Sequence, residues 1–335
     1  MPRRAVVAAT PYGAKMVKSG SPSRASPPRT PATGLRPGEE KPKLELFELP
    51  DIDDEDPLLR ELRQASENAA KCLQRCWNRR PRWSPSYALD MLLEELGRRP
   101  LSAHDVSRAE RRRLTKLGLR VPTSLAYSET PVDMFVGLLG VVASLREAAT
   151  DGVVAEGSVR GRLQGTFYDL GCGTGLLCHT AALFHDFDKV VGFEILAGLF
   201  DEAVALDAYF KLRVAGRLMR RPDKPPAETK FVVGDALGLA WGTGVNAPTV
   251  VYCHSTCFDA ELMGKLAARL AALPPSTFIV TTTFPVPAAV SPSGDETVRF
   301  AVLERYVMTL PFGPITAFIQ QRQMTAQEEY DYGKL

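Results

Sequence analysis

The sequence predicts an α/β fold, a mostly parallel sheet with helices on both faces, and three observations support it. Short apolar segments alternate with amphipathic helical segments over residues 123–325, which is the order of βαβ units. A glycine-rich loop, Gly171-Cys172-Gly173-Thr174-Gly175, separates one such strand from its helix. Two strand-like runs, 301–310 and 315–321, follow the last helix and predict a closing hairpin. We expect the α/β domain to lie between a longer N-terminal part and a short tail at 326–335.

Charge divides the N-terminal part into regions. Residues 1–43 hold nine Lys/Arg, two acids and few large apolar residues, which predicts a disordered basic tail. Residues 44–56 hold seven acids and no base, and residues 57–125 hold fifteen Lys/Arg against seven acids. A basic front half on a mildly acidic remainder favours an anionic partner, nucleic acid above all. The alternative is a soluble tail with solvated helix faces.

Composition excludes several classes of protein. With 335 residues and 45% apolar content, the chain can form one domain of about 200 residues plus additions. No apolar run approaches the length of a membrane span, and the first residues lack the apolar core of a signal peptide. Six cysteines are scattered without C-x-x-C pairs, so we expect reduced intracellular thiols rather than disulfides or a zinc site.

The region 44–122 is predicted to be a small helical element. An acidic lead-in precedes a helix over 58–77, a second helix covers 86–96 and a third covers 104–117, the last two ending at glycines. The third helix carries a strip of basic side chains: Arg108, Arg111, Arg112, Arg113 and Lys116. This strip suits phosphate contacts, although a solvated helix face explains it as well.

The glycine loop joins a predicted buried strand, 166–170, to a predicted helix, 174–184. Glycine is needed where a turn is tight and where a ligand must approach the backbone without meeting a Cβ. An ordinary strand-to-helix turn is the alternative.

Acidic residues lie at the ends of three predicted strands. Asp169 comes two places before the loop, Glu194 ends the strand 189–194, and Asp235 ends the strand 231–235. Glu194 can accept the ribose hydroxyls of an adenosine ligand, and Asp235 suits the adenine amino group. Each acid alone could cap a helix, but three in register at one sheet edge indicate an adenosyl-binding crevice.

The remaining elements follow the same alternation. Thr130 is predicted to cap a helix over 132–145, with Pro131 at its first position. Further along we expect the following elements: a helix at 196–214, an exposed loop at 217–230, a strand at 249–255, a helix at 259–272, a strand at 277–283 and a loop from 285 through 294.

The G-x-G-x-G spacing resembles the first motif of S-adenosylmethionine-dependent methyltransferases, which implies a class I, Rossmann-like fold and S-adenosyl-L-methionine as cofactor. The segment Tyr127-Ser128-Glu129-Thr130 lies about 40 residues before the loop. Together with Val191-Gly192-Phe193-Glu194 and Gly234-Asp235, it resembles the catalytic domain of the disruptor-of-telomeric-silencing family, the non-SET histone lysine methyltransferases. The resemblance covers about residues 120–322.

The resemblance implies a set of cofactor-binding residues. Tyr127, Ser128, Glu129 and Thr130 would close over the methionine part of the cofactor. Its backbone would lie on Asp169, Gly171, Cys172, Gly173 and Gly175, its ribose on Glu194, and its adenine end on Asp235 and Ala236.

Some positions depart from the family's pattern. Ser128 replaces a glycine, and His254, Ser255 and Thr256 stand where the family has two asparagines and a phenylalanine. His254 would have to substitute for a cofactor-contacting asparagine. The resemblance implies catalytic roles for Tyr127 and for aromatic rings lining a lysine channel: Phe258, Phe312 and Phe318, with Phe284 as a further candidate. For each ring, a place in the plain core is the alternative.

The family acts on a lysine in the globular part of a nucleosomal core histone, histone H-three. The resemblance therefore implies a nuclear enzyme whose basic tail and helices contact DNA. Two alternatives stay open: a methyltransferase of RNA or a small molecule, and a cofactor-binding chromatin module with weak turnover.

Overall fold

The computed structural model describes residues 83–149, 161–218, 226–292, 294, 296–325 and 328–329. The predictions for the basic tail, for the helix at 58–77 and for most of the C-terminal tail lie outside these residues. In the described part, none of the helices is long and apolar enough to cross a membrane.

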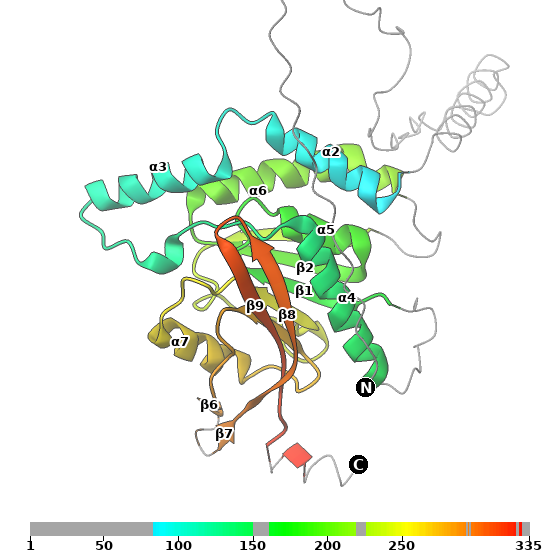
Figure 1. Ribbon diagram of the computed structural model, residues 1–335, viewed down its shortest axis with the longest axis vertical. Helices are drawn as coiled ribbons and strands as arrows, with labels where there is room; N and C mark the ends of the chain where they lie inside the picture. Colours follow the sequence, from blue (N-terminus) through cyan, green and yellow to red (C-terminus); the bar gives the residue numbers. More distant parts are fainter. Residues whose placement is uncertain are drawn as a thin grey trace, which may run out of the picture. The chain divides into compact units, whose positions relative to one another are not determined.

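One seven-stranded sheet organises the described part, in the order β3-β2-β1-β4-β5-β9-β8 (Figure 1). The first five strands are parallel, and β9 runs antiparallel to both β5 and β8. Their bounds are β1 Gln164–Leu170, β2 Asp186–Glu194, β3 Glu228–Val233, β4 Val250–Cys253, β5 Phe278–Thr282, β8 Phe300–Leu310 and β9 Gly313–Arg322. This order, with its terminal hairpin, confirms the predicted class I methyltransferase fold.

Helices cover both faces of the sheet. Their bounds are α2 Pro85–Gly97, α3 Ala103–Lys116, α4 Val132–Ala149, α5 Leu176–Phe184, α6 Ala197–Tyr209 and α7 Ala260–Leu270. Side chains of α2, α4, α5 and α6 share one buried cluster with residues such as Phe167 and Val280. Side chains of α7 share a second cluster with Tyr168 and Ile279, which point to the opposite face. Figure 1 shows α2, α3 and α6 lying together at one side of the sheet.

The chain reverses its direction of winding at β1, which lies between β2 and β4. In open α/β sheets the crevice outside the carboxyl ends of such strands is where ligands bind. The loops that follow β1 and β4 both begin at this edge, and they carry the glycine loop and His254.

Several element bounds differ from the predicted ones for local reasons. Helix α5 starts at Leu176, two residues late, because Gly173 and Gly175 adopt φ values of 55° and 76°. The α-helical part of the predicted helix, α6, ends at Tyr209, and a short π-helix follows it over Phe210–Val214. Strand β3 begins at Glu228, inside the predicted loop, because the chain pairs with Lys189 of β2 from that point. The loop after β5 contains a short pair, β6 Ala289–Val290 and β7 Thr297–Val298.

Candidate functional site

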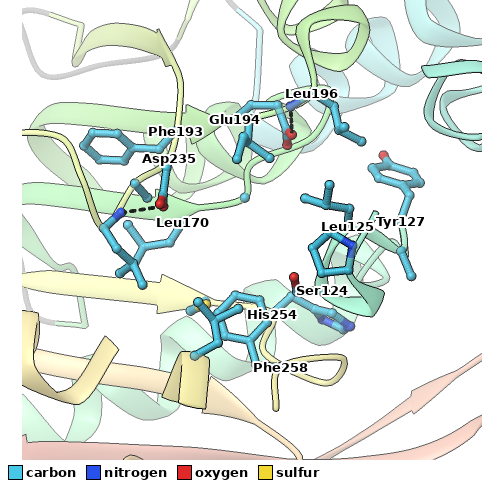
Figure 2. A pocket seen from close by; sticks show the side chains of 18 of the residues that line it. Ser124, Leu125, Tyr127, Leu170, Phe193, Glu194, Leu196, Asp235, His254 and Phe258 are labelled. Atoms are coloured by element: carbon cyan, nitrogen blue, oxygen red, sulfur yellow. Dashed lines mark hydrogen bonds between the residues drawn. The ribbon is translucent and has the colours of Figure 1, made fainter. Parts of the chain in front are cut away.

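Two adjoining cavities lie at the carboxyl edge of the sheet, of about 440 Å³ and about 240 Å³. Four residues line both of them: Tyr127, Ser128, Gly171 and His254. Glu194, Asp235 and Ala236 line the first cavity, whereas Glu129, Thr130 and the glycine loop line the second. Figure 2 shows Tyr127 and Leu125 on one side of the first cavity and Asp235 and Phe193 on the other. The fold thus brings every predicted cofactor-binding residue except Gly175 to one of the two walls.

The glycine loop leaves open space beside its backbone. Gly171 has φ 89°, and a Cβ there would meet nothing within 4 Å. At Gly173 a Cβ would lie 2.6 Å from Tyr127 Cε2, so the ring packs directly on the loop. Gly175 is packed against Phe231 and therefore serves the fold rather than a cavity. A ligand can approach the backbone at Gly171, as the predicted role of that residue requires.

Glu194 ties the glycine loop to the start of α6. Its Oε2 accepts a hydrogen bond from Gly173 N at 2.8 Å. Its Oε1 accepts one from Leu196 N at 2.8 Å, as Figure 2 shows. Burial raises the pKa of this carboxyl, and the backbone N–H donors oppose that shift. Each carboxylate oxygen keeps a further lone pair, so Glu194 can also accept from a ligand's hydroxyls.

Asp169 is a second buried carboxyl, at the end of β1. Burial, and then the neighbouring Glu194, raise its pKa to about 7, while Cys178 has the opposite effect. Cys178 Sγ donates to Asp169 Oδ2 at 3.8 Å. A nearby cation would favour the charged form of this carboxyl and lower its pKa again.

The segment before α4 closes the site from the other side. Tyr127 OH donates to Glu129 Oε1 at 2.6 Å, and burial, then the charge of Glu129, raise the pKa of the phenol well above its usual range. The Tyr127 ring also meets His104 of α3 edge-on, with centroids 5.2 Å apart. This contact joins the N-terminal helical region to the site.

The predicted capping role of Thr130 is wrong. The carbonyl of Pro131 accepts the first bond of α4, from Phe135 N. Thr130 Oγ1 instead lies 2.7 Å from Tyr252 OH and 3.0 Å from His254 Nδ1. The hydroxyl is drawn away from the helix because two polar groups of β4 and its following loop lie within reach.

The first cavity joins a polar turn to an apolar wall. Asp235 Oδ1 accepts a hydrogen bond from Leu237 N at 2.9 Å, which fixes the turn after β3 (Figure 2). Phe258 also lines this cavity, together with Leu262 and Leu266 of α7, and Figure 2 shows it beside His254. Phe258 therefore lies at a cavity of the site, and its role in a lysine channel stays a prediction.

Carboxyl groups set the charge of the second cavity. Glu129 and Asp169 line it, and its lining residues in the described part of the chain include no lysine or arginine. The first cavity differs, because Arg120 stands at its wall together with Glu194 and Asp235. A cationic group therefore suits the second cavity, and a pyrophosphate does not.

The other predicted channel residues lie outside both cavities. Phe312 is 61% exposed at the tip of the β8–β9 turn, beside Pro311, which does line the second cavity. Phe318 lies under Arg305, whose Cζ is 5.8 Å from the ring centroid. Phe284 is exposed beyond β5. The predicted channel role of these three rings has no support in this geometry.

Sequence reasoning missed several residues of the site. Tyr252 lies in a short apolar strand, where nothing in the pattern separates a functional tyrosine from a core one. Arg120, Ser124 and Leu125 line the first cavity from a segment that contains a short 3-10 helix, Thr123–Leu125, and no motif of its own. Proximity to the Tyr127 motif was the only signal for them.

No protein-family model matches the chain, and no curated protein does either. Among solved structures, the chain is similar to the B. subtilis M1A22 tRNA methyltransferase TrmK, at 14% identity and a TM-score of 0.32, over 47% of this chain and 59% of that one. It is also similar to a SAM-dependent methyltransferase from Thiobacillus denitrificans in complex with S-adenosyl-L-homocysteine, at 19% identity and a TM-score of 0.30, over 48% of this chain and 52% of that one. The chain thus spans little more than half the length of these two structures. The YcgJ protein of B. subtilis matches over 97% of its length and 56% of this chain, at 9% identity and a TM-score of 0.35. Likeness at this level carries no information on cofactor or substrate, so the assignment of the site rests on the residues of this chain.

Proposed function

We propose that this protein is an S-adenosylmethionine-dependent methyltransferase. The observation that carries the proposal is the charge of the second cavity, where Glu129 and Asp169 adjoin the open backbone at Gly171. Dinucleotide cofactors place a pyrophosphate beside the glycine loop, and two carboxyls there would repel it. An amino acid carrying an ammonium and a sulfonium has the opposite charge and suits the same wall.

The residues of the two cavities fit the parts of this cofactor. Glu194 would accept the ribose hydroxyls while it keeps its backbone donors, and Asp235 would meet the adenine end. Asp169 would take the ammonium, and Tyr127 would cover the ligand from above the loop. When bound, the cofactor supplies an electrophilic methyl group on sulfur.

We further propose that the methyl acceptor is a lysine in the globular part of a nucleosomal core histone, which places the enzyme in the nucleus. The motif Tyr127-Ser128-Glu129-Thr130 supports this through its resemblance to the non-SET family. The exposed strip of α3 supports it through charge: Arg108, Arg112 and Lys116 are exposed, and α3 touches the site through His104. DNA phosphates beside a histone surface would suit such a strip.

Methyl transfer to an amine needs a neutral nitrogen and close alignment. Apolar surroundings disfavour an ammonium and lower its pKa, so a proton can leave before attack. Orientation of the amine at the methyl group can then supply several kcal/mol of the barrier. We assign no general base, and the residues of the site act by binding, orienting and excluding water.

Transfer of labelled methyl from S-adenosylmethionine to nucleosomes, free histones and RNA, measured in parallel, tests the proposal. We expect label on one histone lysine, with nucleosomes preferred over free histones. Label on RNA alone would replace the histone substrate with RNA. Absence of binding of S-adenosylmethionine and of its demethylated product in calorimetry would overturn the enzyme assignment itself.

A further inference from the structure

Three hydrogen-bonded side chains connect the core of the sheet with the wall between the two cavities. Tyr252 of β4 is 1% exposed, and its hydroxyl lies 2.7 Å from Thr130 Oγ1. Thr130 Oγ1 lies in turn 3.0 Å from His254 Nδ1. The other ring nitrogen, His254 Nε2, is shielded from solvent and has no hydrogen-bond partner among the described residues. His254 lines both cavities.

The protons of this chain can be placed by counting donors and acceptors. If Tyr252 donates to Thr130 and Thr130 donates to His254 Nδ1, every hydroxyl proton is used, and the one remaining group is an Nε2–H. If His254 Nδ1 carries the proton and donates to Thr130, then either the Tyr252 or the Thr130 proton has no acceptor. That arrangement leaves two buried groups unsatisfied instead of one. An additional unsatisfied buried group corresponds to a preference of about tenfold or more for the first arrangement.

The series of hydrogen bonds from His254 through Thr130 ends at Tyr252, inside the protein. Tyr252 packs edge-on against Phe135 in the apolar core, with ring centroids 5.2 Å apart. A proton taken up at His254 could pass inward only as far as this buried phenol. The three residues therefore fix a donor in place and do not conduct protons.

We infer that Thr130 holds His254 as an Nε2–H donor in the wall between the cavities, and that this donor takes a carboxylate oxygen of an amino-acid ligand. The second half of this inference rests on the proposed function. Glu129 and Asp169, which line the second cavity, suit the ammonium of such a ligand. The described residues that line this cavity include no lysine or arginine to meet its carboxylate. Neutral donors of the described part of the chain are left for it, and His254 Nε2–H is one that has no partner among the described residues.

The tautomer can be tested without any ligand. Nitrogen NMR of the full-length protein with labelled histidine, assigned by the signal lost in His254→Gln, reports which ring nitrogen carries the proton. We expect a protonated Nε2 and an unprotonated, hydrogen-bonded Nδ1 in the wild type and in Thr130→Ser. In Thr130→Val the hydrogen-bond shift of Nδ1 should disappear. A wild-type protein with the proton on Nδ1 would overturn the inference.

The ligand group can be tested by comparing two compounds that share the adenosine part. S-adenosylhomocysteine carries the amino-acid carboxylate, whereas 5′-methylthioadenosine lacks it. In calorimetry, His254→Leu should weaken binding of S-adenosylhomocysteine about tenfold or more and change binding of 5′-methylthioadenosine less than twofold. Equal weakening of both compounds, or of neither, would overturn the carboxylate contact. If the wild type binds neither compound, the proposed function fails, while the tautomer result stands on its own.

Discussion

Replacing Glu194 by glutamine should lower both the stability of the protein and its affinity for the cofactor. The carboxylate accepts two backbone hydrogen bonds of 2.8 Å each, from Gly173 N and Leu196 N. A glutamine of the same shape keeps one acceptor oxygen but turns an NH₂ group toward the other backbone N–H. One bond is then lost and a buried donor is left unsatisfied, which costs about 2 kcal/mol. For a domain of this size, the melting temperature should fall by about 4–8 °C.

The affinity effect has a separate cause. Hydrogen bonds from ribose hydroxyls to a charged acceptor contribute about 1.5–3 kcal/mol each, so binding of S-adenosylhomocysteine should weaken about tenfold or more. Melting curves and calorimetry measure the two effects independently. Glu228→Gln is the matched control, because Glu228 lies on the neighbouring strand β3 as an exposed partner of Lys189 at 3.5 Å. If Glu194→Gln melts no lower than this control, the two backbone hydrogen bonds to Glu194 do not stabilise the fold as we expect. If its affinity for S-adenosylhomocysteine is unchanged, Glu194 does not bind the ribose.

Three further predictions follow from other parts of the structure. Gly173→Ala would place a methyl group 2.6 Å from Tyr127 Cε2 on a left-handed backbone, so we expect at least tenfold weaker binding of S-adenosylhomocysteine in calorimetry. His179 is fully buried, and both ring nitrogens lack a partner among the described residues, so burial lowers its pKa to about 4. Because the unfolded pKa is near 6.5, the unfolded state binds more protons, and about 3 kcal/mol of stability should be lost as the pH falls from 6.5 to 4. His179→Leu should lack this loss in urea titrations at both pH values. Reversing the charge of Arg112 and Lys116 together should weaken nucleosome binding and reduce its salt dependence, while binding of S-adenosylhomocysteine in calorimetry stays the same.

Each of these predictions has a control within the same fold. Gly264→Ala in α7 adds a methyl group where nothing lies within 4 Å, so ligand binding should not change. The wild type and His179→Leu both contain His185, whose pKa burial also lowers to about 4. Its contribution to the loss of stability at low pH therefore cancels when the two proteins are compared. Lys265→Glu reverses an exposed charge on α7, and it should leave nucleosome affinity nearly unchanged if α3 is the contact surface. Equal loss in both charge variants would point to net charge rather than to a located surface.

The fold was predictable because its signals are local. The alternation of apolar and amphipathic segments placed each of the seven long strands, and glycines at 97 and 118 marked the ends of two helices. The strand order could be anticipated only through the glycine loop, since β1 must lie at the point where the winding reverses. Boundaries were less accurate where pairing decided them, as at Glu228, which joins β3 through its partner on β2.

The site was predictable where backbone geometry dictated the residue and unpredictable where contacts across the fold did. Gly171 and Glu194 follow from the turn and the strand end, and both lie on the cavity wall. Thr130 had every local feature of a helix cap, yet its hydroxyl bonds to Tyr252 and His254, which lie more than 120 residues further along the chain. A local pattern cannot weigh a partner that only the folded sheet brings within reach.

Folding and ligand binding depend on the same bonds at this edge of the sheet. Glu194 holds the glycine loop and the start of α6 together, and Tyr127 packs on that loop at Gly173. Asp169 is buried beside them, and its burial and the nearby Glu194 raise its pKa to about 7, so the site brings carboxyl groups close together. A ligand that brings an ammonium next to Asp169 would relieve that repulsion, and any compound that binds only the folded state raises its stability by mass action. Stabilisation by S-adenosylhomocysteine should therefore be larger at pH 8, where Asp169 is charged, than at pH 6, where it is mostly protonated.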